Sequence, residues 1–170
     1  YKNIDHVAKM SGKNYRFKTK LQYQSCNFIR KCIINNYGIK FDSLPYQKVD
    51  KSFVKDNYDH KKDMILVSCG ASSNKNDSNY NTWWNDYLGD QCKKYKVTNN
   101  TRDYKNGDIV FEDKISGVRS ELRNGFTIHS VQGETYDGKI FIDMRKMRDL
   151  KMFYTAVSRA RTEDQVYLIN

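Results

Sequence analysis

The chain has 170 residues, of which 38% are hydrophobic and 29% charged, and this composition suits one globular domain with a real core. No window approaches the roughly 18 consecutive apolar residues of a membrane helix, and no apolar signal core is present, so we exclude a membrane partner and expect an intracellular location. Lys and Arg exceed Asp and Glu by ten, which fits either a binder of polyanions or a generally basic surface.

The first 60 residues carry the weakest pattern. Apolar residues at roughly helical spacing predict a helix over residues 21–34, and Tyr37-Gly38 closes it because glycine commonly ends helices. A turn is expected at Leu44-Pro45 and a short helix over residues 52–58. We treat residues 1–60 as an N-terminal, partly helical segment.

The middle of the chain begins with a short apolar run, Met64 to Cys69, which is typical of a buried strand in a parallel sheet. A polar loop over residues 70–81 follows, and Thr82 is placed to cap a helix over residues 82–88. The other expected elements are a strand over residues 94–98, a turn at Asn106-Gly107, a strand over residues 108–111 and a loop over residues 116–125.

The last 45 residues have the clearest pattern. Leu150, Phe153, Tyr154 and Val157 recur at the spacing of an amphipathic helix. Strands alternating with a helix predict an α/β fold with a mostly parallel sheet flanked by helices, and we assign residues 61–170 to this domain. The strands are expected at residues 126–128, 139–143 and 165–169.

Arg159 is the first candidate site residue. At about 100° per residue it lies opposite Leu150, on an outward side shared with Thr155 and Ser158. A cation on a rigid helix can reach across a cleft to a phosphate, as an arginine finger does when it neutralises charge during phosphoryl transfer. The same spacing also fits a solvated surface arginine.

The turn over residues 126–138 is the second candidate. It gathers Thr127, His129, Ser130 and Gln132 between two predicted strands, and its glycine permits close approach of another backbone. Such a turn lies at the carboxyl end of a strand, where open parallel sheets bind ligands. His129 taken alone fits a hydrogen-bonded structural histidine as well.

The cysteines and histidines predict no metal site. The four cysteines contain no C-x-x-C pair and the three histidines complete no zinc pattern, so reduced thiols are expected. Trp83 and Trp84 are either core residues, which we favour, or an exposed surface on which single-stranded bases stack.

Two motifs resemble a known family. Residues 127–133, Thr-Ile-His-Ser-Val-Gln-Gly, resemble motif V of superfamily 1 helicases, and residues 153–161, Phe-Tyr-Thr-Ala-Val-Ser-Arg-Ala-Arg, resemble motif VI in the form found in RecD-type and viral helicases. They stand in the family's order, separated by a strand and a short linker. The resemblance covers residues 126–170 and implies a second RecA-like domain. A composition rich in residues of A/T-rich codons fits a virus or an A/T-rich microbe.

The resemblance also implies a role for each matching residue. Arg159 corresponds to the catalytic arginine that reaches the γ-phosphate of ATP from the second domain. The other implied site residues are Gln132, Gly133 and Glu134 on the nucleotide side of the motif V turn, and Thr127, His129 and Ser130 near the phosphates of the nucleic-acid strand.

Two positions depart from the family pattern. Many members carry a ribose-contacting glutamate two residues after the motif V glycine, whereas here Glu134 follows Gly133 directly and Thr135 takes that place. Residues 21–25, Leu-Gln-Tyr-Gln-Ser, faintly resemble motif IV, with Gln24 where an arginine is usual. Either this alignment is wrong or one γ-phosphate contact is missing.

No G-x-x-x-x-G-K-[S/T] phosphate loop is present. In the family, ATP and Mg²⁺ are held mainly by an N-terminal RecA-like domain, which we expect in the same parent protein, since this chain starts with Tyr1 and reads as an excised piece. The resemblance implies one half of an ATP-dependent helicase motor that acts on DNA, or on RNA, and is inactive by itself. The alternative is a non-catalytic nucleic-acid-binding module with a helicase-like fold.

Overall fold

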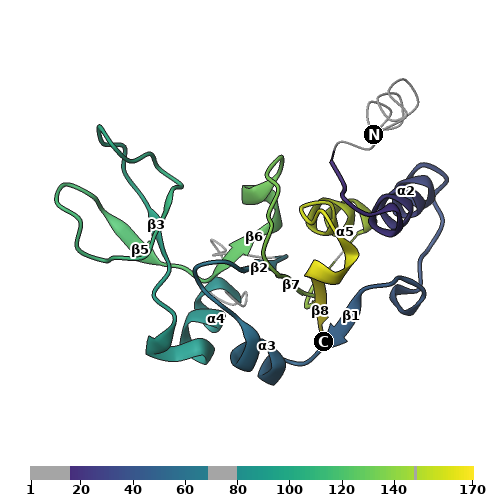
Figure 1. The fold of residues 1–170 in the computed structure, drawn as a ribbon, viewed down its shortest axis with the longest axis horizontal. Helices are drawn as coiled ribbons and strands as arrows, with labels where there is room; N and C mark the ends of the chain where they lie inside the picture. Colours follow the sequence, from purple (N-terminus) through teal and green to yellow (C-terminus); the bar gives the residue numbers. More distant parts are fainter. Residues whose placement is uncertain (1–15, 69–79, 148) are drawn as a thin grey trace.

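The computed structural model describes residues 16–68, 80–147 and 149–170. At its centre is a five-stranded sheet in which all neighbouring strands are parallel (Figure 1). The strands are β1 (Gln47–Val49), β2 (Met64–Val67), β6 (Gly125–Thr127), β7 (Ile140–Asp143) and β8 (Val166–Ile169). Their order is β1-β8-β7-β2-β6, so strands distant in sequence lie side by side. This confirms the predicted, mostly parallel sheet.

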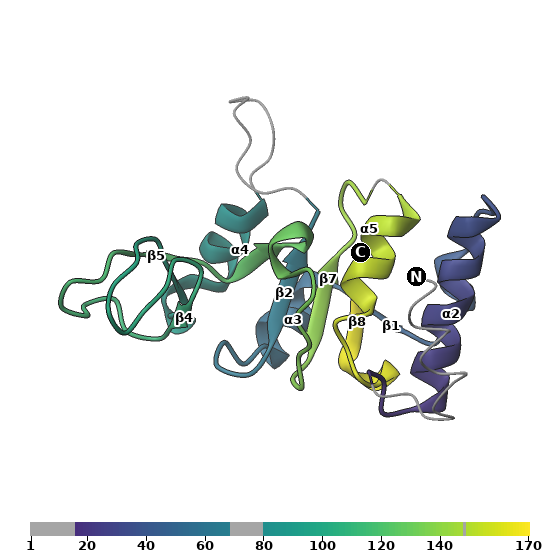
Figure 2. The same ribbon diagram turned by 90° about the horizontal axis from the view of Figure 1, so that it is seen from above.

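Helices cover both faces of this sheet (Figure 2). On one face lie α2 (Lys20–Ile34) and α5 (Leu150–Val157), and on the other lie α3 (Lys51–Asn57) and α4 (Tyr80–Leu88). Because successive side chains of a strand point to opposite faces, Leu66 packs in the core with α2 and α5, whereas Ile65 packs with α3 and α4. All residues of β2 and β7 are buried, which explains the apolar sequence of β2 and of the first three residues of β7.

Elements that precede residue 60 share this sheet and core. β1 pairs in parallel with β8, so that Lys48 lies opposite Leu168. α2 packs along α5, and Cys26 lies in the same hydrophobic cluster as Phe153. Residues 16–60 thus contribute an edge strand and a covering helix to the domain that contains the later strands.

The predicted helices are present, with shifts at their ends. α2 and α3 each begin one residue earlier than expected. The described part of α4 begins at Tyr80, so Thr82 lies inside the helix and its predicted role as a cap is wrong. Asp149 caps α5 by accepting the backbone N–H of Met152 at 2.8 Å. Cys69 and residues 70–79 of the predicted polar loop lie outside the described residues.

A small antiparallel sheet, the accessory sheet, projects from the main sheet (Figure 1). Its strands follow α4 and precede β6 in the sequence. It consists of β3 (Tyr95–Val97), β4 (Ile109–Val110) and β5 (Ser120–Leu122) in the order β4-β3-β5. β3 and β4 confirm predicted strands, but the loop predicted over residues 116–125 is wrong because it contains β5. That strand lacks an apolar run: its Glu121 lies opposite Lys96, an opposite-charge pair across two strands.

Short 3-10 helices connect several of these elements within the described residues. The last of them leads into β8, and Gln165 there donates its side-chain amide to the carbonyl oxygens of Tyr136 (2.9 Å) and Gly138 (2.7 Å). These two hydrogen bonds hold the segment that leads into β7 beside the segment that leads into β8. The 3-10 helices are η1 (Phe41–Ser43), η2 (Gly89–Gln91), η3 (Ile128–Val131) and η4 (Glu163–Gln165). No helix among the described residues is long and apolar enough to cross a membrane.

Candidate nucleotide and nucleic-acid site

The first part of the candidate site follows the carboxyl end of β6, where the predicted turn was expected. Ile128 and Val131 are buried and anchor η3 to the core. His129 and Ser130 are exposed between them, and the Ser130 hydroxyl donates to the carbonyl oxygen of Thr127 at 2.7 Å. The short helix therefore presents polar side chains to solvent at a strand end, the usual ligand edge of a parallel sheet.

Residues 132–134 form the second part and lead from η3 back toward the amino end of β7. Gln132, Gly133 and Glu134 are exposed, and the turn closes when the Glu134 N–H donates to Val131 at 3.1 Å. Gly133 has a φ of 90°, a left-handed conformation that residues with side chains rarely adopt. The Glu134 carboxylate accepts a hydrogen bond from the Tyr136 hydroxyl, so its charge is directed to a neighbour in the turn.

Arg159 does not project outward from α5, and the outward placement predicted from helical spacing is wrong. The helix ends at Val157, Ser158 is fully buried, and the Arg159 residue is only 4% exposed. Beyond the helix end the backbone N–H groups of Arg159 and Ala160 donate to residues three positions back, at 3.2 Å each. This tightened turn rotates the side chain away from the direction that 100° per residue would give it.

The structure brings Arg159 and the 132–134 turn together. The Arg159 Nη1 donates to the carbonyl oxygen of Glu134 at 2.9 Å, although the two residues are 25 positions apart. In return, the N–H of Tyr136 donates to the Arg159 carbonyl oxygen at 2.9 Å, and Tyr136 forms a parallel bridge with Ala160. The two sequence motifs thus form one continuous unit, whereas His129 and Ser130 lie at the other end of the turn.

Arg159 has only neutral hydrogen-bond partners among the described residues. Besides Glu134 O, its Nε donates to Thr155 O and its Nη2 to Ser158 Oγ, both at 2.9 Å. Burial lowers the pKa of the guanidinium to about 10, and the nearby Arg16 adds to this effect. Arg159 remains cationic at neutral pH with no ion-paired carboxylate in the described chain, and an uncompensated guanidinium is suited to a phosphate.

Sequence reasoning missed Gln22, a fully buried glutamine of α2 that bonds to the backbone on both sides of Arg159. The only signal in the sequence was the faint motif IV resemblance of residues 21–25, and that resemblance singled out Gln24 rather than Gln22. Gln24 is exposed on the same helix. A polar residue at a buried helical position is not distinguished by spacing from one at an exposed position.

The tryptophans pack rather than form a free stacking surface. Trp84 is 1% exposed, and its Nε1 donates to the Asp143 carboxylate at 2.9 Å. Trp83 stacks on Tyr87, with ring centroids 5.0 Å apart, and carries the Arg145 guanidinium 4.1 Å from its ring centroid. Trp83 is partly buried and packs against the core, as the core interpretation expected.

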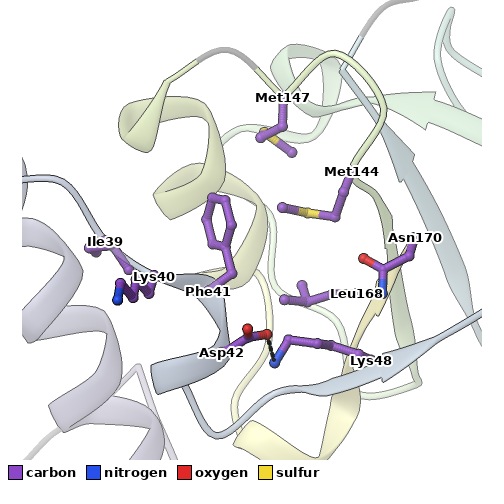
Figure 3. A pocket seen from close by; sticks show the side chains of 9 residues that line it. All are labelled: Ile39, Lys40, Phe41, Asp42, Lys48, Met144, Met147, Leu168 and Asn170. Carbon is purple, nitrogen blue, oxygen red and sulfur yellow. Dashed lines mark ion pairs between the residues drawn. The ribbon is translucent and has the colours of Figure 1, made fainter.

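Two hollows lie at the carboxyl ends of β7 and β8. One, of about 440 Å³, is shown in Figure 3: Phe41, Met144, Met147 and Leu168 form an apolar floor beside the Lys48–Asp42 ion pair (2.7 Å). The other, of about 300 Å³, lies against Trp83 and Arg145. Neither is lined by Arg159 or by residues 127–134.

The described residues contain no group of three or more His, Cys, Asp or Glu side chains that could hold a metal ion. Cys26, Cys32 and Cys92 are free thiols. Burial raises the pKa of the Cys26 thiol to about 12 and also raises that of Cys92, so both are poor nucleophiles at neutral pH.

Two solved structures share this fold. One describes DNA unwinding at forked double-stranded DNA by two coordinating Pif1 helicases; it is 19% identical, and the match covers 92% of this chain and 48% of that one with a TM-score of 0.55. The other is the Pif1 helicase from Bacteroides in complex with ADP-AlF3 and single-stranded DNA, 18% identical over 92% of this chain and 50% of that one, with a TM-score of 0.50.

The fold is thus RecA-like, as in these Pif1 helicases, and the chain spans about half the length of the helicases it matches. No model of a known protein family matches the sequence, and no curated protein matches it either. At this level of identity the likeness defines the architecture, and the roles of individual residues rest on the geometry of the site.

Proposed function

We propose that this chain is the C-terminal motor domain of an ATP-dependent superfamily 1 helicase, of the RecD-like type, with residues 127–133 as motif V and residues 153–161 as motif VI. The observation that carries the proposal is the bond between Arg159 and the 132–134 turn. It joins a cation that has no carboxylate partner among the described residues to a segment that leads directly to exposed polar side chains at a strand end. A motor needs such a connection between nucleotide and strand.

In this proposal Arg159 acts as the arginine finger. Its Nη1 exchanges the carbonyl oxygen of Glu134 for an oxygen of the γ-phosphate, because a charge-assisted hydrogen bond is stronger than one to a neutral carbonyl. The guanidinium then stabilises the charge that develops during transfer to water. Gln132, Gly133 and Glu134 line the nucleotide side of the turn, while ATP and Mg²⁺ are held mainly by an N-terminal RecA-like domain of the same parent protein.

When Arg159 releases the carbonyl oxygen of Glu134, nucleotide binding can affect the contacts with the nucleic-acid strand. The 132–134 turn continues into η3, whose exposed His129 and Ser130, with Thr127, contact phosphates of single-stranded DNA or RNA. Backbone contacts of this kind are independent of sequence. A shift of the turn when Arg159 changes partner therefore alters the grip on the strand.

The decisive experiment is Arg159→Ala in the complete protein. We expect ATP turnover to fall by about 10³ to 10⁵, the range found for arginine fingers, while nucleic-acid binding is largely kept. Arg161→Ala is the matched control: this arginine lies two residues on, and its Nε pairs with the exposed Asp137 at 3.0 Å. Near-normal turnover in Arg159→Ala would contradict the proposal.

The strand contacts are tested separately with the double variant His129→Ala, Ser130→Ala. Its affinity for single-stranded DNA should fall, and stimulation of ATP turnover by DNA should require more DNA, with basal turnover retained. A parent protein that lacks a phosphate loop yet binds single strands tightly would instead identify the chain as a non-catalytic nucleic-acid-binding module.

A further inference from the structure

Gln22 is a polar side chain for which the proposed function has no role. It lies in α2 with no exposed surface, and buried polar groups are stable only when they are hydrogen-bonded. Its side-chain amide nitrogen donates to the carbonyl oxygens of Val157 (2.9 Å) and Ala160 (3.1 Å). Its oxygen accepts the hydroxyl hydrogen of Tyr46 at 2.9 Å. Both ends of the amide are therefore engaged.

The two carbonyls that Gln22 binds belong to the backbone around Arg159. Val157 is the last residue of α5, and its carbonyl oxygen also accepts the backbone N–H of Ala160 at 3.2 Å. Ala160 follows Arg159 directly. One side chain thus satisfies an acceptor before and an acceptor after the candidate finger, and it fixes the path of the backbone from which that finger extends.

Tyr46 determines which way the Gln22 amide points. The Tyr46 side chain is buried, and this burial raises the pKa of its hydroxyl far above the ordinary value, so the hydroxyl keeps its proton. A protonated hydroxyl directed at Gln22 can donate to the amide oxygen, which leaves the amide NH₂ for the two carbonyls. Tyr46, Gln22 and the end of α5 form one ordered chain of hydrogen bonds.

We propose that Gln22 is a positioning residue for Arg159, which it holds at the distance and angle that phosphate contact requires; the inference rests on the proposed function. Misplacement of a catalytic group by about 1 Å can cost about 10²-fold in rate, so the loss of the Gln22 hydrogen bonds should slow turnover.

The test uses the complete protein with Gln22→Met, which keeps the length of the side chain and removes both hydrogen-bonding ends. We expect kcat for ATP to fall by about 10- to 100-fold, with KM and single-strand affinity within about twofold. Tyr46→Phe, which loses only the orienting hydroxyl, should show a smaller fall in kcat. Gln24→Met, an exposed neighbour on the same helix, is the matched control and should leave kcat unchanged.

The double variant separates positioning from general stability. In an Arg159→Ala background, Gln22→Met should cause no further loss of kcat, because a residue that acts through Arg159 has nothing left to position. An additional loss of similar size would mean that Gln22 only supports the fold, and would overturn the inference. If Gln22→Met does not fold, Tyr46→Phe in both backgrounds decides the same question.

The outcomes also distinguish this inference from the proposed function. Unchanged kcat in Gln22→Met, together with strong loss in Arg159→Ala, rejects positioning and leaves the helicase proposal intact. Near-normal turnover in Arg159→Ala itself rejects the helicase proposal.

Discussion

At the scale of single residues, Asp143 is a carboxylate that is almost entirely buried at the end of β7. Its Oδ2 accepts the Trp84 Nε1 at 2.9 Å, and both its oxygens accept the Arg145 Nε at 3.0 Å. The guanidinium of Arg145 in turn lies over the rings of Tyr80 and Trp83, at 4.2 and 4.1 Å from their centroids. Arg145 thus neutralises the charge of Asp143, and this ion pair orders the aromatic side chains around it.

Removal of this carboxylate should destabilise the domain strongly. Asp143→Ala leaves a cation and an indole N–H without their partner, and breaking a buried pair costs about 3 kcal/mol. Asp137→Ala is the control, because Asp137 also pairs with an arginine but is 74% exposed, and such a surface pair contributes under about 1 kcal/mol. Urea unfolding of the three proteins measures the difference; equal losses would contradict the expectation.

Lys94 is a second buried charge, and it makes stability depend on pH. Its Nζ donates to the carbonyl oxygen of Asp63 at 2.8 Å, and burial lowers its pKa to about 8. Between pH 8 and about 10.5 the unfolded chain therefore keeps a proton that the folded chain has released. Because the unfolded state binds more protons there, stability contributed by Lys94 rises with pH through this window.

This rise should disappear in Lys94→Met. From pH 7.5 to 10, we expect the wild-type chain to gain up to about 3 kcal/mol relative to the variant, at about 1.4 kcal/mol per unit of pKa shift. The exposed Lys93→Met is the control and should follow the wild-type pH dependence. Unfolding free energies from urea titrations at both pH values give the comparison, and parallel curves for wild type and Lys94→Met would refute it.

At the scale of elements, the sequence predicts best where burial imposes a pattern. β2 and β7 are buried on both faces, and α5 has one apolar side, so apolar runs and helical spacing identified them. β1 and β5 are short and largely solvent-exposed, and nothing in their composition distinguishes them from loops. Their existence depends on partners, β8 and β3, that lie far along the chain.

The candidate site shows the same limit. The positions of Thr127, His129 and Ser130 at a strand end follow from local pattern. The burial of Arg159 does not, because helical periodicity stops at Val157 and the side chain is then directed by bonds to Glu134 and Ser158. Contacts between distant segments, including those of Gln22, have no local signature.

The junction between the 132–134 turn and β7 depends on one glycine. A Cβ on Gly138 would lie 2.0 Å from the carbonyl oxygen of Lys62, which is backbone and cannot move aside easily. Gly138→Ala should therefore displace the start of β7 from β2 and cost several kcal/mol, as overpacking does at its upper end. Gly38→Ala is the control, because nothing lies within 4 Å of its Cβ and no change beyond about 1 kcal/mol is expected. Thermal unfolding of both variants tests this.

At the scale of the whole molecule, the proposed motor is divided between two domains. We expect this chain alone to show no ATP turnover, because it lacks a phosphate loop. It should still bind single-stranded DNA weakly, with an affinity that falls steeply as salt rises, since its net charge is +10. Turnover should appear when the phosphate-loop domain of the parent protein is added. Turnover by purified chain alone would contradict the shared site.

Asn124 fastens the accessory sheet to the rest of the domain. This fully buried residue stands between β5 and β6; its side chain contacts the Tyr58 hydroxyl (3.0 Å) and the carbonyl of Cys92 (3.3 Å), and its N–H donates to Asn85 at 2.9 Å. We therefore expect a force on the accessory sheet to pass through the hydrogen bonds of Asn124 to the segments that contain Tyr58, Asn85 and Cys92, rather than along the chain to Thr127. In the proposed helicase, we therefore expect a nucleic-acid strand that displaces the accessory sheet to leave η3 largely unmoved.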